Sequence, residues 1–173
     1  MDLEQHIRNI PDFPIDGINF KDITTLLKDP AALKESIDRL TDPYRDNPPD
    51  LIVAVEARGF VFATAMAYQL GCGFAPVRKP GKLPAPTASE TYELEYGTDE
   101  VQIHRDAISS GTRVLIVDDL LATGGTAAAA ARLIERLGGI VTGLAFLIEL
   151  DFLNGRAALA DYDLTALIHY GGE

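Results

Sequence analysis

Two adjacent carboxylates and a glycine-rich turn stand together in the second half of the chain. Asp118 and Asp119 follow 114–117, a run of branched apolar residues typical of a strand buried on both faces. The turn that comes next consists of Ala122, Thr123, Gly124, Gly125 and Thr126. Glycines let backbone N–H groups approach a ligand closely, and the threonines add hydroxyl donors. Since 127–137 is expected to be a helix whose N-terminus favours an anion, we predict a phosphate site here.

The two acids restrict what else this ligand contains. A bare phosphate would be repelled by Asp118 and Asp119, so the ligand must also offer sugar hydroxyls or carry a divalent metal ion. No Lys-Ser or Lys-Thr pair follows the glycines, so the ATPase type of phosphate loop is not matched. The alternative is an ordinary strand closed by a glycine turn, and Gly-Gly-Thr alone would favour that reading.

A second loop of the same kind precedes the first in the chain. The apolar run 51–55 predicts a buried strand, Glu56-Ala57-Arg58-Gly59 follows it, and 60–70 reads as an apolar helix ended by Gly71. In an open parallel sheet the ligand crevice lies at the carboxyl ends of the strands. Two such loops on one sheet could therefore hold the two ends of a single anionic ligand.

The segment 78–86 concentrates positive charge in an acidic chain. It carries Arg78, Lys79 and Lys82 among three prolines and a glycine, so it is not expected to be helical. Such a loop is either a solvated excursion or a lid for an anionic group, and we favour the lid. The alternating segments 91–96 and 101–104 predict a β-hairpin that carries it.

The N-terminal part combines a short periodic stretch with an irregular one. Leu3, His6, Ile7 and Ile10 fall at helical spacing, which predicts a helix ended by Pro11. The segment 13–23 contains a proline and a glycine near its start, which predicts an irregular, extended conformation. Taken alone, it could simply be an arm that packs Phe13 and Phe20 into the core.

Composition limits the classes of function. The net charge of −11 argues against a general nucleic-acid or anionic-membrane surface. The single cysteine, Cys72, excludes an intrachain disulfide framework and fits a reducing cytosol. No signal peptide or membrane span is evident, and the three histidines are too scattered to suggest a metal site. Alternating strands and helices over 1–173 predict one α/β domain with a parallel sheet.

Taken together, these motifs resemble the type I phosphoribosyltransferases, and along nearly the whole chain the adenine phosphoribosyltransferase family. The string 114–126 marks the superfamily only. The arm 13–23 and the sequence Leu94-Glu95-Tyr96-Gly97 point to the adenine-specific branch. Small departures fall at 63–64 and at the lid tip, 86–90, and they affect the closing contacts of the lid rather than the chemistry.

The resemblance implies a fold and a reaction. The fold is α/β, with a central, mostly parallel sheet flanked by helices, a β-hairpin lid within 78–104 and a small base-binding arm within 1–28. The reaction transfers the 5-phosphoribosyl group of phosphoribosyl pyrophosphate to adenine, giving AMP and pyrophosphate in purine salvage. The resemblance also implies Mg²⁺ held largely through the substrate, a cytoplasmic homodimer, and a cis peptide bond between Glu56 and Ala57.

The resemblance assigns a role to each motif. The turn 122–126 should hold the 5′-phosphate, and Asp118 and Asp119 the ribose hydroxyls. The catalytic candidates are Arg58, Glu95 as general acid/base, and Tyr96 as a support of the lid. The base should be held by Phe20, which stacks on it, and by backbone groups near Asn19 and Lys21. The pyrophosphate should be bound by Arg58, Arg78, Lys79 and Lys82, with Arg78 coming from a second subunit.

Two alternatives stay open. One is a phosphoribosyltransferase for a 6-oxo purine or orotate, against which the adenine-type arm argues. The other is a non-catalytic regulator that senses phosphoribosyl pyrophosphate, against which the absence of room for a DNA-binding domain argues. A purely structural reading leaves Asp118, Asp119 and the basic loop unexplained.

Overall fold

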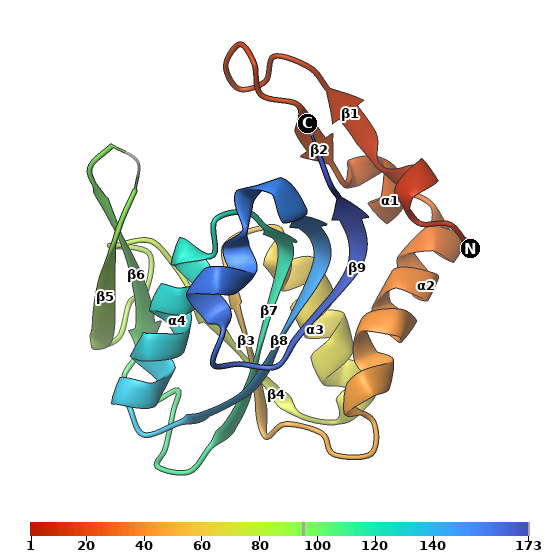
Figure 1. Ribbon diagram of the computed structural model, residues 1–173. Coiled ribbons are helices and arrows are strands. Elements are labelled where there is room, and N and C mark those ends of the chain that lie inside the picture. The colour runs from red at the N-terminus through yellow and green to blue at the C-terminus, as the bar shows by residue number, and fades with distance from the viewer. Residues whose placement is uncertain (95, 173) are drawn as a thin grey trace.

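A parallel sheet forms the centre of the computed structural model, which describes residues 1–94 and 96–172 (Figure 1). Its five strands lie in the order β4-β3-β7-β8-β9, so the predicted parallel α/β sheet is confirmed. Their bounds are Leu51–Val55 for β3, Gly73–Val77 for β4, Arg113–Leu121 for β7, Ile140–Leu150 for β8 and Leu164–Tyr170 for β9.

Helices cover both faces of this sheet. The helix α3 (Gly59–Leu70) packs on one face, with α2 (Pro30–Thr41) beside it, and α4 (Gly125–Arg136) packs on the other (Figure 1). Alternate residues of the central strand separate the two cores: Val114 and Ile116 pack with α4, while Leu115 and Val117 pack with α3. This two-sided burial explains why 114–117 is continuously apolar.

Helix ends follow the capping residues in the sequence. The Asp29 side chain accepts from the N–H groups of Ala31 and Ala32, with Pro30 in the first turn of α2. Gly71 ends α3 with a φ of +69°. The shorter helices are α1 (Thr24–Leu27) and the 3₁₀ turns η1 (Glu4–His6), η2 (Asp42–Tyr44), η3 (Asp151–Leu153) and η4 (Gly155–Leu159). Asn154 precedes η4, but its side chain makes no capping hydrogen bond.

The prediction of a helix across the first ten residues is wrong. Only η1 is helical, and Arg8–Ile10 forms the strand β1, which pairs antiparallel with β2 (Phe20–Asp22). Leu3 and Ile7 are buried as the periodicity suggested, but a strand that lies ten residues further on captures the backbone of β1. Tertiary pairing overrides the local pattern.

The predicted hairpin is confirmed and is longer than its sequence signal. It consists of β5 (Thr87–Glu93) and β6 (Thr98–His104), which pair antiparallel, and β5 packs beside α4. In Figure 1 the hairpin and the N-terminal arm stand on either side of the edge at which β7, β8 and β9 end. Within the described residues, no helix has the length and hydropathy needed to cross a membrane.

Candidate active site

The glycine-rich turn joins β7 to α4 and lines a cavity of about 90 Å³. Gly124 precedes the helix with a φ of +84°, and a Cβ there would lie 2.6 Å from the backbone oxygen of Gly155. Glycine is therefore required both by the backbone conformation and by the contact. The turn places Gly125 and Thr126 in the first turn of a twelve-residue helix, where backbone N–H groups have no intrahelical acceptor.

The two carboxylates lie inside β7 and do not end it, which corrects the expectation. The strand continues to Leu121 because β8 continues beside it, with Asp118 opposite Phe146 and Leu120 opposite Ile148. Asp119 is only 4% exposed. A Cβ on Gly59 would lie 2.6 Å from Asp118 Oδ1, so the start of α3 can approach this carboxyl group only at a glycine.

Burial raises the pKa of both carboxyl groups. For Asp118 the pKa lies well above the usual range, because desolvation is reinforced by the charge of Asp119. For Asp119 desolvation also raises the pKa, and the guanidinium of Arg58 opposes that rise. Burial and the mutual repulsion of the two carboxylates thus make ionisation of the pair costly, which is typical of a site built to meet a ligand.

Arg58 connects the acid pair to the N-terminal arm. Its Nε lies 2.8 Å from Asp119 Oδ2, yet no N–H among the described residues is aligned to donate to that buried oxygen. The guanidinium carbon of Arg58 lies 5.1 Å from the ring centroid of Phe20, and Phe20 packs edge-to-face on Phe13 at 5.2 Å. The predicted ribose and base residues are therefore neighbours.

The arm contains a second buried oxygen without a partner. Asn19 Oδ1 accepts no hydrogen bond from the described part of the chain. The Lys21 ammonium, by contrast, donates to Asn9 Oδ1 at 2.9 Å and lies 4.2 Å from the Tyr170 ring centroid. Lys21 therefore presents only its backbone to a ligand beside Phe20.

The basic loop is fastened to the Glu56 loop. The Lys79 N–H donates to Glu56 Oε1 at 2.6 Å, and Arg78 Nε lies 3.4 Å from the same oxygen. These contacts hold the pKa of Glu56 below its usual value, the Lys79 N–H first and the Arg78 charge after it. The peptide bond between Glu56 and Ala57 is cis, as expected. Lys82 is exposed, and only its backbone N–H contacts Lys79, at 3.4 Å.

Tyr92 belongs to the site, and the sequence analysis did not single it out. Its hydroxyl donates to Asp99 Oδ2 at 3.1 Å and accepts from Lys79 Nζ and from Thr126 Oγ1, each at 3.1 Å. Lys79 also forms an ion pair with Asp99. This network links the basic loop to the first turn of α4. The available signal was the alternation of the hairpin, which makes Tyr92 its inward-facing aromatic residue.

Two of the predicted catalytic residues, Glu95 and Tyr96, belong to the hairpin tip. Glu95 lies outside the described residues. Tyr96 is 86% exposed and Leu94 is 49% exposed, whereas Tyr92 is buried. A larger hollow of about 670 Å³ lies between 5–8 and 25–30, away from these groups. We assign the site by its converging polar groups and not by volume.

Comparison with known proteins first shows the general class of protein to which the chain belongs. A family model described as the phosphoribosyl transferase domain matches residues 22–163. This class accounts for the glycine-rich turn, the acid pair and the basic loop together.

Individual relatives show the family within this class. The adenine phosphoribosyltransferase of Thermotoga neapolitana is 61% identical over 98% of this chain and 100% of its own length. The crystal structure of the adenine phosphoribosyltransferase from Thermoanaerobacter pseudethanolicus matches with a TM-score of 0.95 and 57% identity, over 98% of both chains. That from Saccharomyces cerevisiae, complexed with an imino-altritol bisphosphate and adenine, matches with a TM-score of 0.90 and 41% identity, over 96% of both chains. The chain belongs to the adenine phosphoribosyltransferase family.

Proposed function

We propose that the crevice between the arm, the glycine-rich turn and the basic loop performs the reaction of the family. It transfers the 5-phosphoribosyl group from phosphoribosyl pyrophosphate to adenine and releases AMP and pyrophosphate, a step of purine salvage. One chain of contacts carries the proposal: Arg58 lies against Phe20 and pairs with Asp119, and the adjacent Asp118 lines the same cavity as the glycine-rich turn. A nucleoside 5′-phosphate has the same order of base, sugar and phosphate.

The donor sugar is the part of the substrate with the most specific support. We assign the 5′-phosphate to the turn 122–126, where free N–H groups at the start of α4 meet threonine hydroxyls. We assign the ribose hydroxyls to Asp118 and Asp119, because Asp119 Oδ2 is buried and lacks an aligned donor. A ribose hydroxyl would satisfy this oxygen.

The pyrophosphate end is assigned to the cations around Glu56. Arg58 and Arg78 approach from the two loops, and Lys79 and Lys82 come from the basic loop. An exposed basic loop in a chain of net charge −11 is suited to an anion that arrives and leaves. Arg78 lies beside Glu56 of its own chain, and its reaching the pyrophosphate of a partner subunit in the homodimer is a separate part of this proposal.

Mg²⁺ is the cofactor that this substrate requires. The residues fit such an ion, since Asp119 Oδ2, which pairs with Arg58 but receives no aligned hydrogen bond, can accept from metal-bound water while substrate oxygens supply the direct ligands. When bound with the donor, the ion offsets the charge that develops on the leaving pyrophosphate. Arg58 and Lys79 do the same from the protein side.

Base selection is assigned to the arm. Phe20 offers a ring for stacking, and Asn19 carries a buried oxygen that needs a donor, such as the amino group of adenine. The backbone of Lys21 is the other polar group available at this edge. A 6-oxo purine presents an acceptor where adenine presents a donor, and the mismatch leaves buried polar groups unpaired.

The chemical step breaks a bond at the anomeric carbon, so an oxocarbenium-like transition state is expected. Asp118 and Asp119 hold the sugar and place negative charge beside it. The hairpin tip closes over the crevice and excludes water, which would hydrolyse the activated sugar. We assign proton transfer at the purine ring to Glu95 and support of the closed tip to Tyr96.

We further propose one functional domain, 1–173, that works as a cytoplasmic homodimer. The outer face of α3 supports the dimer: Tyr68 is 90% exposed and Val61 41%, beside an apolar groove that includes Leu33 and Ile37. Tyr68→Glu should shift the protein from dimer to monomer in sedimentation. A monomeric wild type would refute the dimer. The single cysteine supports the reducing compartment.

The direct test incubates the protein with Mg²⁺, phosphoribosyl pyrophosphate and each of adenine, hypoxanthine, guanine, xanthine and orotate. We expect AMP from adenine and at most traces of product from the others. No AMP would defeat the enzymatic proposal, while faster turnover of another base would defeat the assignment of the arm. Glu95→Gln should lower kcat, and an unchanged kcat would remove Glu95 from its role.

A further inference from the structure

Glu149 and Arg156 stand next to the glycine-rich turn and have no part in the reaction proposed above. We propose that they form a brace that positions the turn 122–126 for the substrate phosphate; this inference rests on the proposed role of that turn. Both are positioning residues, since they act through the backbone of Gly155 and touch no substrate.

The backbone at Gly155 contacts the backbone of the glycine-rich turn. A Cβ on Gly155 would lie 2.3 Å from the oxygen of Ala122, and a Cβ on Gly124 would lie 2.6 Å from the oxygen of Gly155. The backbone at Gly155 therefore lies directly against the turn, with no side chain between them. In a packed interior, a shift of one backbone must move the other.

Gly155 is held in place by the ion pair that its neighbour Arg156 forms with Glu149. Arg156, the next residue, donates from Nε to Glu149 Oε1 at 2.8 Å and to Oε2 at 3.0 Å, and from Nη2 to Oε2 at 2.8 Å. Such a bidentate ion pair fixes the orientation of the two side chains as well as their distance. The chain from 150 to 155 is thereby folded back onto the strand that it has just left.

Glu149 is also connected to the turn through the pairing of β8 with β7. Glu149 lies in β8 directly opposite Leu121 of β7, and Leu121 is the residue that precedes the turn. The turn is thus supported from both sides: by β7, whose register is set by β8, and by Gly155, whose position is set by the ion pair on β8. Glu149 is only 3% exposed, and a carboxylate so buried is retained only when it is paired.

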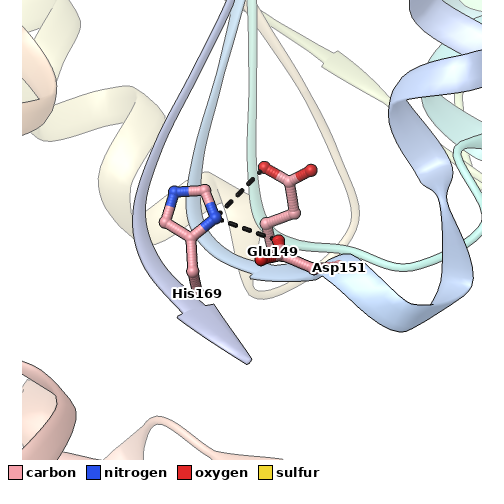
Figure 2. Close-up of side chains that lie close together, drawn as sticks. All are labelled: Glu149, Asp151 and His169. Atoms are coloured by element: carbon pink, nitrogen blue, oxygen red, sulfur yellow. Dashed lines mark hydrogen bonds and ion pairs between the residues drawn. The ribbon is translucent and has the colours of Figure 1, made fainter. Parts of the chain in front are cut away.

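A neighbouring cluster invites a different interpretation. Figure 2 shows His169 pointing at Glu149 and Asp151, with Nδ1 3.0 Å from Asp151 Oδ1 and 3.6 Å from Glu149 Oε2. These are metal-ligand types within 4.8 Å of one another. Both oxygens of Glu149 already accept from Arg156, so a metal ion would have to displace a guanidinium. The cluster is better described as a set of polar contacts from His169 that tie β9 to the brace.

The experiment compares binding at the two ends of the substrate. Calorimetry on the full chain measures the Kd of ribose 5-phosphate, which has only the phosphate end, and of pyrophosphate with Mg²⁺, which has only the other. Arg156→Gln should raise the Kd of ribose 5-phosphate by roughly tenfold, because small displacements of a binding group are costly. The Kd of pyrophosphate should change by less than about twofold, since Arg58 and Lys79 do not depend on the brace.

Arg45→Gln is the matched control. Arg45 forms an ion pair with Asp42 at 2.7 Å and its side chain is 46% exposed, against 2.8 Å and 48% for Arg156, but it lies away from the turn. It should change neither Kd. Arg156→Lys, which keeps the charge, should recover part of the loss.

Three outcomes overturn the brace. They are an unchanged Kd of ribose 5-phosphate in Arg156→Gln, an equal loss at both ends, and a double variant Glu149→Gln/Arg156→Gln that is worse than the product of the two single effects. If Arg156→Gln does not fold, Glu149→Gln alone, which keeps the shape of the pair, decides by the same ratio. Thr123→Val tests the turn itself: if ribose 5-phosphate binds it as tightly as wild type, the proposed role of the turn fails, and not the brace alone.

Discussion

The glycine-rich turn and the N-terminal arm differ in how completely their groups are satisfied. Around the turn, backbone meets backbone at Gly124 and Gly155, and the nearby buried carboxylate of Glu149 is fully paired. In the arm, Phe13 is 50% exposed, Ile15 67% and Ile18 42%, and Asn19 Oδ1 has no partner among the described residues. This difference indicates that the phosphate end of the site is preorganised, whereas the base end is completed by its ligand.

Gly124→Ala should have the largest effect, because it attacks the preorganised end. An alanine must adopt a φ of +84° and its Cβ would meet the backbone of Gly155. We expect kcat/KM for phosphoribosyl pyrophosphate to fall by about a hundredfold or more. Gly111→Ala is the control: its φ is +83°, but open space surrounds it, so it should lose stability only. Equal kinetics for the two variants would show that the contact is irrelevant.

Asp118→Asn separates activity from stability at the same end. The loss of a charged acceptor for a ribose hydroxyl should lower kcat/KM by about 10- to 100-fold. Because the folded-state pKa of Asp118 is raised, its ionisation destabilises the fold at pH values above that pKa and not below the unfolded value. Asp118→Asn should therefore raise Tm at neutral pH, and the gain should vanish in acid. A lower Tm at neutral pH would contradict the assigned shift.

Phe20→Ala tests the ligand-completed end. Stacking of an aromatic ring on a base is worth about 1–3 kcal/mol, so KM for adenine should rise by about 5- to 150-fold while the Kd of ribose 5-phosphate stays constant. Phe13→Ala, which removes only the ring behind Phe20, should have a smaller effect. Steady-state kinetics with varied adenine checks both variants. A change in ribose 5-phosphate binding would mean that the two ends are not independent.

Tyr92→Phe should have the smallest effect. It tests whether Tyr92 belongs to the phosphate end of the site or to the base end. It removes a hydroxyl that joins Thr126 to Lys79 but leaves the ion pair of Lys79 with Asp99. We expect KM for phosphoribosyl pyrophosphate to rise by about three- to fivefold, because Lys79 and Asp99 still pair with each other and only the hydrogen bond from Thr126 is lost without replacement. KM for adenine should not change. A larger effect on adenine would place Tyr92 on the base side.

The sequence predicted those parts of the fold that depend on local pattern. The buried strands, the end of α3 at Gly71 and the hairpin all have their signals within a few residues. The strand β1 was predicted as a helix because its partner lies outside any local window. For the same reason Asp118 and Asp119 were placed after the strand: only the length of β8 shows that β7 continues past them.

The candidate site was predictable as motifs but not as contacts. The glycine-rich turn, Arg58 and the basic loop could be named from residue types and the family resemblance. Tyr92, and the brace of Glu149 and Arg156, could not, because their roles arise from distances between elements. The buried oxygens of Asp119 and Asn19 that receive no hydrogen bond from the described residues could not be predicted either, since a missing hydrogen bond has no signature in sequence.

The division between a preorganised phosphate end and a base end completed by adenine is tested most directly by one ratio. It is kcat/KM for adenine divided by kcat/KM for hypoxanthine, measured in wild type and in Gly124→Ala. We predict a wild-type ratio of about 10³ or more, because hypoxanthine leaves buried polar groups unpaired in the arm. The ratio should be unchanged in Gly124→Ala although the rate collapses. A wild-type ratio near one, or a ratio that falls with the damaged turn, would contradict the account.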